Sequence, residues 1–303
     1  MQTILLKTHT KLEVTQKPMA HHHLLPFLAL ILLILPSSSH ASETPALFSD
    51  PPQFLSGGHN LTVGNTTLSL SNDCGLILYL DDAPFIDFKT STTASQCILQ
   101  LNRYGQLVLT PGDETGKTQT ILKKGAEGDY ALLFVGGTLS IYGPATWNNN
   151  VSVPSSALKQ GMLKAGTSDV FIVSDQIVNS GVNPSNGNVI AAITENCTFA
   201  VTNDITGEKI WETTREYDNL EDCYLLLVDG LLLLQGYNGS TLLTQWTGGY
   251  PAGLNFYVAV LRYYGRITIY GLSNFLGVSP SSAAVAVAAA AAAAAGNIKM
   301  VTV

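Results

Sequence analysis

Short apolar runs recur along the chain at a nearly fixed interval. The three clearest are Leu76–Tyr79, Leu107–Thr110 and Leu139–Tyr142, whose first residues lie 31 and 32 positions apart. A weaker series of three runs follows, near Thr198, Leu231 and Arg266, which are 33 and 35 positions apart. A fixed internal period indicates a repeated structural unit. The pattern therefore predicts six short sheets in two groups of three.

The runs themselves are β-rich and are separated by turn residues such as Gly-Gly, Asn and Asp-Asp. The expected strands are Leu61–Val63, Thr67–Leu70, Leu76–Tyr79, Cys97–Leu101, Leu107–Thr110, Ala131–Val135, Leu139–Tyr142, Val170–Val173, Val189–Ile193, Thr198–Val201, Tyr224–Leu227, Leu231–Leu234, Tyr257–Leu261 and Ile267–Tyr270. No part of this region has the pattern of a long helix. The segment Asn148–Gly166 shows no clear strand and is interpreted as a linker.

Composition agrees with an all-β protein that has room for two domains. The chain has 303 residues, with 27 Gly, 13 Pro and only 12% charged residues. Its formal net charge is −7. Because no basic face is available to neutralise phosphates, we expect no nucleic-acid partner.

The two ends of the chain suggest processing. Leu24–Leu35 is an apolar stretch followed by a Ser run and by Ser39–Ala41, which suits a signal-peptidase site. Residues 1–41 are predicted to be a signal peptide, with a buried helix or an anchor as the alternative, and the apolar stretch is too short to span a bilayer. The Ala-rich segment Ala283–Ala295 favours helix but is also too short to span, so residues 277–303 are interpreted as a propeptide or disordered tail, with a lipid anchor as the alternative.

Secretion determines how the four cysteines are interpreted. An oxidising compartment favours disulfides over metal or redox chemistry, and four cysteines allow three connectivities. One pair lies inside each group of repeats, which favours Cys74–Cys97 and Cys197–Cys223.

The motifs of the first group resemble the monocot bulb-type mannose-binding lectin domain. The matching residues are Ser71–Tyr79 (SNDCGLILY), Cys97, Tyr104–Leu109 (YGQLVL) and Ile141–Trp147 (IYGPATW). The second group is similar more distantly, and the tandem arrangement is most like aroid storage lectins. The resemblance implies an all-β fold of two β-prism II domains, each with three short antiparallel sheets around a pseudo-threefold axis. We expect these domains at residues 42–152 and 167–276 with a linker at 153–166.

The resemblance also implies core tryptophans, a processed tail and a sugar site. Trp147, Trp211 and Trp246 are expected to pack in the interior. The C-terminal extension would be removed, as in bulb-lectin precursors. A homodimer formed by strand exchange is allowed.

The family's sugar site reads Gln-x-Asp-x-Asn-x-Val-x-Tyr. Alternate residues of an extended strand share a face, so amides, a carboxylate and a phenol can bond a hexose while the branched side chain covers its apolar patch. Two repeats keep the most of this motif. The first repeat keeps Asp73, Ile77 and Tyr79, and the second offers Asn102, Gln106 and Val108.

The remaining repeats depart from the motif, and even the first has Ser71 and Gly75 in place of the two amides. Sites that depend on hydroxyl hydrogen bonds lose affinity sharply when their partners become apolar. We therefore expect a carbohydrate-binding plant defence or storage protein with weakened or altered mannose-type sites. The alternative is a protein-interaction or storage protein that kept the scaffold and lost the sugar.

Catalysis and cofactors find no support in the sequence. After residue 42 the chain has a single histidine, His59, so no His-dependent triad or His-rich metal site is predicted. We expect no enzyme activity, no cofactor, no metal and no stable membrane span, with residence outside the cell or in the vacuole. Glycosylation acceptors by pattern are Asn60, Asn65, Asn150 and Asn238.

Overall fold

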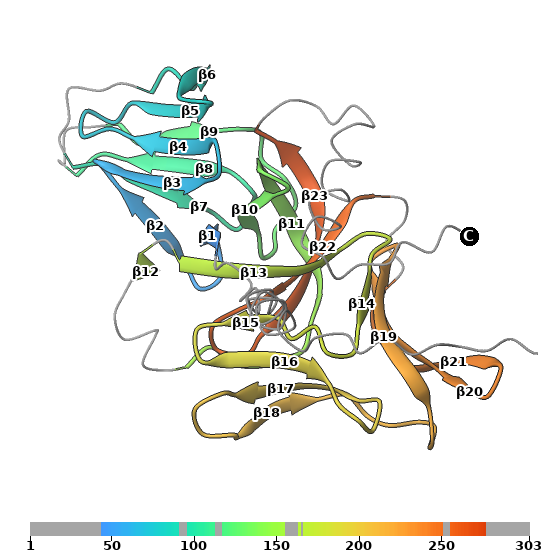
Figure 1. The fold of residues 1–303 in the computed structure, drawn as a ribbon. Helices are drawn as coiled ribbons and strands as arrows, with labels where there is room; N and C mark the ends of the chain where they lie inside the picture. Colours follow the sequence, from blue (N-terminus) through green and yellow to red (C-terminus); the bar gives the residue numbers. More distant parts are fainter. Residues whose placement is uncertain are drawn as a thin grey trace, which may run out of the picture. The chain divides into compact units, whose positions relative to one another are not determined.

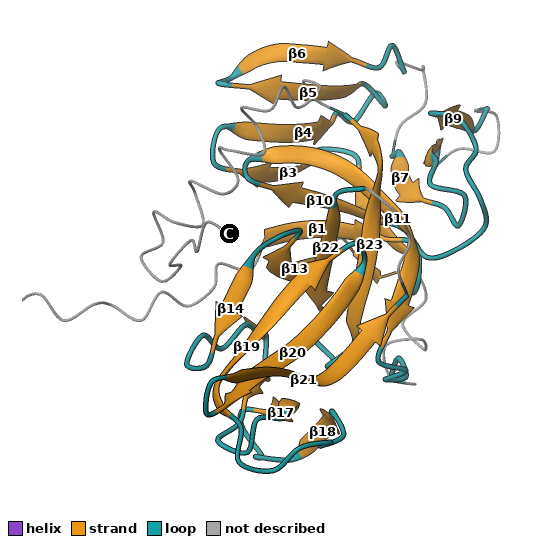
Figure 2. Cartoon of the chain, turned by 90° about the vertical axis from the view of Figure 1, so that its right-hand side faces the viewer, coloured by secondary structure: helices purple, strands orange, loops and turns teal. Residues whose placement is uncertain are grey.

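The computed structural model describes residues 44–90, 96–112, 117–154, 163–164, 166–250 and 255–276. The expected signal peptide and Ala-rich tail lie outside these residues. Within these residues every regular secondary-structure element is a β-strand, as Figure 2 shows. The predicted all-β class is confirmed.

The first half of the chain contributes eleven strands. They are β1 (Thr44–Phe48), β2 (Gln53–Ser56), β3 (His59–Val63), β4 (Thr66–Leu70), β5 (Leu76–Leu80), β6 (Ala83–Asp87), β7 (Ile98–Leu101), β8 (Leu107–Thr110), β9 (Gln119–Ile121), β10 (Ala131–Val135) and β11 (Thr138–Asn148).

The second half contributes the other strands (Figure 1). They are β12 (Leu163–Lys164), β13 (Gly166–Val173), β14 (Ile177–Asn179), β15 (Ser185–Asn186), β16 (Val189–Ile193), β17 (Phe199–Asn203), β18 (Lys209–Glu212), β19 (Glu221–Val228), β20 (Leu231–Asn238), β21 (Thr241–Gly249), β22 (Tyr257–Leu261) and β23 (Ile267–Phe275).

Each half holds two separate sheets. In the first half these are β3-β4-β5-β6 and β2-β7-β8-β9, the second of which is extended beside β2 by β12 of the second half. In the second half they are β15-β16-β17-β18 and β14-β19-β20-β21. Most strands of these sheets alternate between core and outer face, as a side-chain period of two gives when one face is buried. In β5, for example, Leu76 and Leu78 are buried while Ile77 and Tyr79 face outward. The short β12, which pairs in parallel with β2, lies inside the segment expected to be a linker.

The third sheet of each half joins the other to form one closed barrel with the strand order β1-β10-β11-β23-β22-β13. Two of its seams connect the halves. β1 pairs with β13 at one seam, and β11 pairs with β23 at the other. The predicted β-prism II fold is confirmed, and the barrel is the feature that the repeat pattern did not predict.

The strands β11 and β23 each end in the core of the opposite half. Trp147, near the end of β11, packs against the apolar cluster of the second half. Leu276, just after β23, is 2% exposed and belongs to the cluster of the first half. A third cluster, which includes Phe48, Tyr142 and Tyr270, contains residues of β1, β10, β11, β13, β22 and β23 and so forms the core of the barrel.

Disulfides and aromatic contacts fix the two cores further. Cys74 is joined to Cys97, with a Cα–Cα distance of 5.4 Å, and Cys197 to Cys223 at 5.7 Å, which are the pairs expected from the sequence. The rings of Trp147, Trp211 and Trp246 form one cluster with centroids 5.6 to 6.3 Å apart. This cluster agrees with the packing role expected for the tryptophans.

Candidate functional site

The first repeat places its motif on a turn followed by β5. Ser71–Gly75 forms the turn, in which the Ser71 N–H donates to the Gly75 carbonyl over 2.9 Å and Cys74 adopts a φ of 66°. The extended strand begins only at Leu76. The alternation expected to align the whole motif therefore holds for Ile77 and Tyr79, but not for Asp73.

Asp73 is exposed and stays next to Ser71. The Ser71 hydroxyl donates to a carboxylate oxygen of Asp73, and it also accepts the Gly75 N–H over 2.8 Å. The hydrogen bond from Ser71 is the main reason that the pKa of Asp73 lies below its ordinary value. Asp73 therefore presents an ionised carboxylate, which accepts strong hydrogen bonds from hydroxyl groups.

Tyr79 lies beside a hollow between the first sheet and the β10–β11 hairpin. Its other walls include Thr66, Leu80, Phe85 and the hairpin residues Gly137–Leu139. The Thr66 hydroxyl donates to the Gly137 carbonyl over 2.6 Å and so ties the hairpin to β4. The hollow is lined by Leu78 and Leu80, which alternate with Ile77 and Tyr79 along β5. The outer face of the first repeat therefore consists of the outward Ile77 and Tyr79, with the Asp73 carboxylate in the preceding turn.

Sequence reasoning missed Asp87, which lies directly opposite Ile77 in the β5–β6 pair. Asp87 is exposed, and Lys89, which donates to it, holds the pKa of its carboxyl below the ordinary value. The two-residue turn Asp81–Asp82, with φ values of 52° and 60°, connects β5 to β6. Such a turn is typical of a hairpin, so this dipeptide was the available signal for a strand at Asp87.

The side-chain amides of the second repeat form hydrogen bonds with each other and with the nearby backbone. The Asn102 side-chain oxygen accepts the N–H groups of Tyr104 and Gln106 over 2.9 and 3.0 Å. Its amide nitrogen donates to the Gln106 side-chain oxygen over 3.1 Å. Lys124 lies over the Tyr104 ring at 3.9 Å from its centroid. Val108 faces outward on β8, but Asn102 and Gln106 would have to give up internal bonds to bind a sugar.

The third and sixth repeats lie in the barrel wall, where their motif positions are mostly buried. Tyr142 is 3% exposed and Tyr270 is fully buried, and both belong to the barrel core. Burial raises the pKa of Tyr270 well above its ordinary value. These two motif copies therefore serve mainly to hold the halves together.

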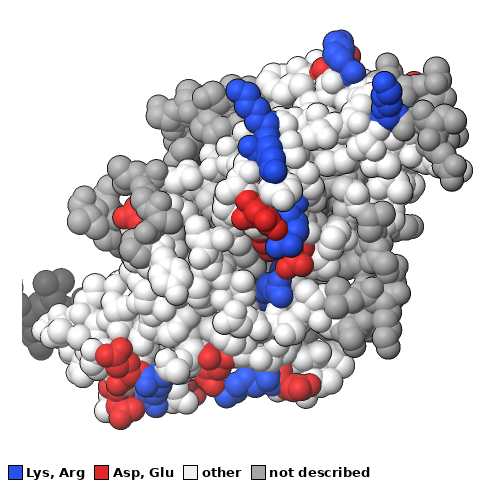
Figure 3. Space-filling model, turned by 180° about the vertical axis from the view of Figure 1, so that it is seen from behind, with Lys and Arg blue, Asp and Glu red and all other residues white. Residues whose placement is uncertain are grey.

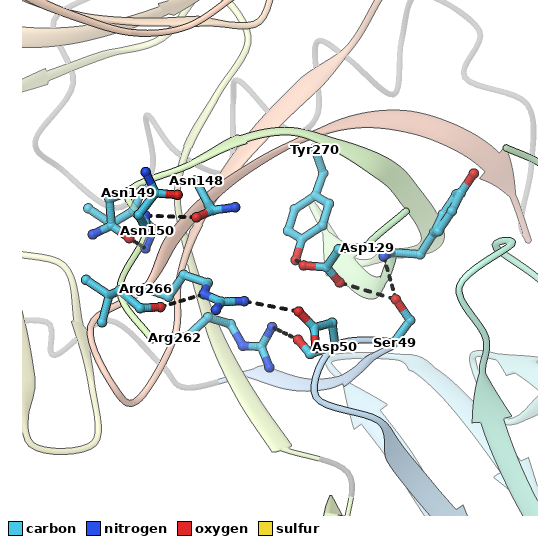
Figure 4. A network of polar contacts seen from close by, with 12 residues as sticks. Ser49, Asp50, Asp129, Asn148, Asn149, Asn150, Arg262, Arg266 and Tyr270 are labelled. Atoms are coloured by element: carbon cyan, nitrogen blue, oxygen red, sulfur yellow. Dashed lines mark hydrogen bonds and ion pairs between the residues drawn. The ribbon is translucent and has the colours of Figure 1, made fainter. Parts of the chain in front are cut away.

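A polar network connects the sixth repeat to the first half (Figure 4). Tyr270 donates to Asp129 over 2.9 Å, and the Ser49 hydroxyl donates to the other Asp129 oxygen over 3.2 Å. The fully buried Arg262 lies over the Phe48 ring, 3.3 Å from its centroid. Burial raises the pKa of Asp129 to about 6, although the charge of Arg262 and the Tyr270 hydrogen bond oppose the rise.

The fourth and fifth repeats offer weaker polar faces. In the fourth, Thr194 and Thr198 share a hydrogen bond of 2.7 Å, and Thr198 is largely buried and donates to Glu212. In the fifth, Leu231 and Leu233 occupy outward positions of β20. The outer face of that sheet is therefore aliphatic where the motif would be polar.

Charged groups do not form a basic surface on the face drawn in Figure 3, where Lys and Arg are interspersed with Asp and Glu. Within the described ranges, no group of three or more His, Cys, Asp or Glu side chains is placed to hold a metal ion. In the same part of the chain, no helix is long and apolar enough to cross a membrane.

Comparison with known proteins shows lectin relatives over most of the chain. Mannose-specific lectin 2 of Colocasia esculenta is 27% identical over 246 residues, covering 80% of this chain and 88% of the relative. Mannose-specific lectin 1 of Remusatia vivipara is 26% identical over 274 residues, covering 84% and 95%. No family model matches the chain. The resemblance inferred from the sequence is confirmed by these relatives.

A solved structure supports the fold. The fetuin-binding agglutinin of Scilla campanulata, a two-domain lectin, superposes with a TM-score of 0.59 over 76% of this chain and 99% of its own, at 20% identity. At that identity the likeness speaks for the tandem β-prism fold alone.

Proposed function

We propose that this protein is a lectin that binds mannose-containing glycans weakly, through the outer face of the first repeat. The relatives that cover most of the chain are mannose-specific lectins, which supports carbohydrate binding. The residues proposed for contact are Asp73, Ile77 and Tyr79, with Asn102, Gln106 and Val108 as a secondary site.

One observation carries the choice of the first repeat. Asp73 is an exposed, ionised carboxylate that lies in the turn before the outward residues Ile77 and Tyr79. A hexose needs hydrogen-bond acceptors for its hydroxyls and an apolar surface for its C–H face. In the second repeat the amides are already paired, and in the barrel repeats the positions are mostly buried.

The site lacks two amides of the family motif and is expected to be weak. Each lost hydrogen bond is worth about 1 kcal/mol, so the pair corresponds to roughly 30-fold in affinity. Binding would then depend on several sites acting together.

The test is titration of the full-length protein with a mannose oligosaccharide, followed by calorimetry or NMR. Asp73→Ala should weaken binding by about tenfold or more, because it removes a charge-assisted acceptor. Asp204→Ala, at an exposed aspartate of the second half, is the matched control and should bind like wild type. Equal binding by wild type and Asp73→Ala would place the site elsewhere.

A gain-of-function variant tests the motif itself. Ser71→Gln together with Gly75→Asn should raise the affinity by about 30-fold if two hydrogen bonds are restored. No gain in a correctly folded double variant would show that the family motif does not operate on this turn.

The second candidate is a protein-binding or storage role on the same scaffold. The observation that favours it is the aliphatic outer face of the fifth repeat, with Leu226, Leu231 and Leu233 on adjacent strands. An antiparallel sheet that faces water normally presents polar residues there. A glycan array on the purified protein separates the two candidates.

Secretion, a defence or storage role, a homodimer and glycosylation belong to the same proposal. Glycosylation is supported by the accessibility of the predicted acceptor residues, because Asn60, Asn65, Asn150 and Asn238 are all exposed. Asn65 already donates to Asp81 over 2.7 Å, so a glycan there would replace an exposed hydrogen bond.

A further inference from the structure

The sheet β14-β19-β20-β21 has an apolar outer face, the outer face of the fifth repeat (Figure 2). In one row across the strands, Ile177 lies opposite Leu226, and Leu226 lies opposite Leu233. In the neighbouring row Val228 lies opposite Leu231. None of these five side chains belongs to the three apolar clusters of the described core. Their apolar surface is therefore not used to hold the described fold together.

A row of paired polar groups continues the same face. The Tyr224 hydroxyl donates to Gln235 over 3.0 Å, and the Gln235 amide donates to the Thr244 hydroxyl over 3.1 Å. Because these groups already bond one another, covering the row costs less than covering unpaired polar groups. Beyond the row, Tyr237 and Leu242 lie opposite each other and are 38% and 45% exposed. An exposed apolar surface of this kind is typical of a binding site for another molecule.

Carboxylates flank the face at both ends of the sheet. Asp229 lies in the β19–β20 turn, and Asp175 lies near it, where its N–H donates to the Leu227 carbonyl over 2.7 Å. Glu221 and Asp222 lie at the opposite end, at the start of β19. All four carboxylate residues are exposed, and no ion pair between described residues includes any of them.

The same segments contain no basic residue. Residues 175–182 and 219–250, which hold the four strands and their turns, have no Lys or Arg. Arg215 lies in the loop that binds Gln245 of β21, and it is paired with Asp218 over 3.2 Å. The matching partner therefore has aliphatic side chains flanked by basic groups, since charge complementarity selects partners and speeds their association. An anionic membrane surface would be repelled by the same carboxylates.

We propose that the outer face of the fifth repeat binds a basic amphipathic helix of another protein. From Leu231 to Tyr237 the face extends about 20 Å along β20, which is the length of a helix of about 13 residues. A helix laid on a sheet forms a stable layer, with its aliphatic stripe over Leu226 and Leu233 and its Lys or Arg side chains at the carboxylates. The inference is independent of the sugar site, and it names the partner for the protein-binding role given above as the second candidate.

The test is titration of the full-length protein with a labelled synthetic helix of Leu and Lys, about 14 residues long, followed by fluorescence anisotropy. Leu226→Thr together with Leu233→Thr should weaken binding by at least about tenfold, because two aliphatic contacts are lost. Threonine suits an outward strand position, so the fold is kept. Ile190→Thr, the same kind of change on the outer face of β16, is the control and should leave the affinity within about twofold.

The carboxylates are tested by Asp222→Asn together with Asp229→Asn. Both residues have a left-handed backbone, with φ values of 49° and 50°, which asparagine tolerates. The double variant should bind the Lys peptide about threefold or more weakly at low salt, and its affinity should depend less on salt. Asp204→Asn, at an exposed aspartate after β17, is the control and should bind like wild type.

Equal affinity of wild type and the folded Leu226→Thr, Leu233→Thr variant would overturn the proposal, and so would absence of binding by wild type. Equal binding of a matched peptide with Glu at every Lys would also overturn it. Self-association of the free protein in sedimentation, lost in the same variant, would make a second copy the occupant and would refute the proposed partner. Asp73→Ala should leave peptide binding unchanged, so a failure of the sugar site is distinguished from a failure of this proposal.

Discussion

Tyr270 donates its hydroxyl hydrogen to Asp129 over 2.9 Å, and the two residues belong to opposite halves of the chain. Asp129 also accepts from Ser49 and lies in the field of the buried Arg262. The contact between the halves therefore includes a carboxyl group that titrates in a mildly acidic range, because its pKa is about 6.

The first prediction concerns pH. Because the pKa of Asp129 rises from 3.8 to about 6 in the fold, the folded protein favours the protonated form. The contribution of Asp129 to the unfolding free energy is complete below about pH 4, and it falls as the pH rises through about 6. The loss amounts to about 3 kcal/mol. Asp129→Asn resembles the protonated form and removes this dependence.

The measurement is urea unfolding of wild type and Asp129→Asn between pH 4 and pH 7. The stability of the variant relative to wild type should rise by about 2.5 kcal/mol over that range, because the remainder of the change lies below pH 4. The lowered pKa values of Asp73, Asp87 and Glu212 make the unfolding free energy rise with pH. This effect is the same in both proteins, so it cancels when their unfolding free energies are subtracted. A difference that stays constant with pH would contradict the prediction.

The second prediction couples Ser71 to Gly75. A Cβ at position 75 would lie 2.8 Å from the Ser71 hydroxyl oxygen, whereas the backbone there is not left-handed. Gly75→Asn alone should cost about 1–2 kcal/mol, because the hydroxyl must leave its hydrogen bonds. With Ser71→Gln present, the additional cost should be smaller by about 0.5 kcal/mol or more. Unfolding of the two single variants and the double variant measures the coupling, and strict additivity would rule it out.

The third prediction concerns Gly236 on β20. A Cβ there would meet the Cys223 sulfur at 2.6 Å and the Cys197 sulfur at 3.2 Å. Gly236→Ala should therefore destabilise the protein by about 1–3 kcal/mol through overpacking. In a background in which both cysteines are alanine, the same change should cost much less. Thermal unfolding of the four proteins checks this, and an unchanged cost would mean that the disulfide is not the obstacle.

The fourth prediction uses Trp147, which comes from the first half but packs with Trp211 and Trp246 in the second. Trp147→Ala should lower the stability reported by the fluorescence of the two remaining tryptophans by about 3 kcal/mol. Trp147→Phe keeps an aromatic ring and should lose about half as much. If Trp147→Ala leaves the fluorescence transition unchanged, the ring does not support the second core.

Strands with one buried face were predictable from the sequence. In β5 and β8 the alternation of buried and outward residues gives the strand directly. The strand β1 was missed because Ala46, Leu47 and Phe48 are all fully buried, so no alternation remains. The strand β21 was also missed, and its register shifts between Leu234 and Gln235 of its partner β20.

The site was predictable only in part. The motif identified Asp73, Ile77 and Tyr79, but the left-handed backbone at Cys74, which takes Asp73 off the strand face, has no local sequence signal beyond the turn itself. The burial of Tyr142 and Tyr270 depends on the seam between β11 and β23, whose strands are far apart in the sequence. Pairing between such distant strands follows from tertiary packing and leaves no local pattern.

The closed barrel also constrains when the protein can finish folding. Its strand β1 pairs with β13, and its strand β11 pairs with β23, which is the final described strand. A chain emerging from the ribosome therefore exposes the unpaired outer edges of β1 and β11 until most of the sequence has been made. Long-range pairing of this kind is slow, and its open edges invite aggregation. We expect chains shortened before Ile267 to aggregate during synthesis, while their disulfides and separate sheets can still form.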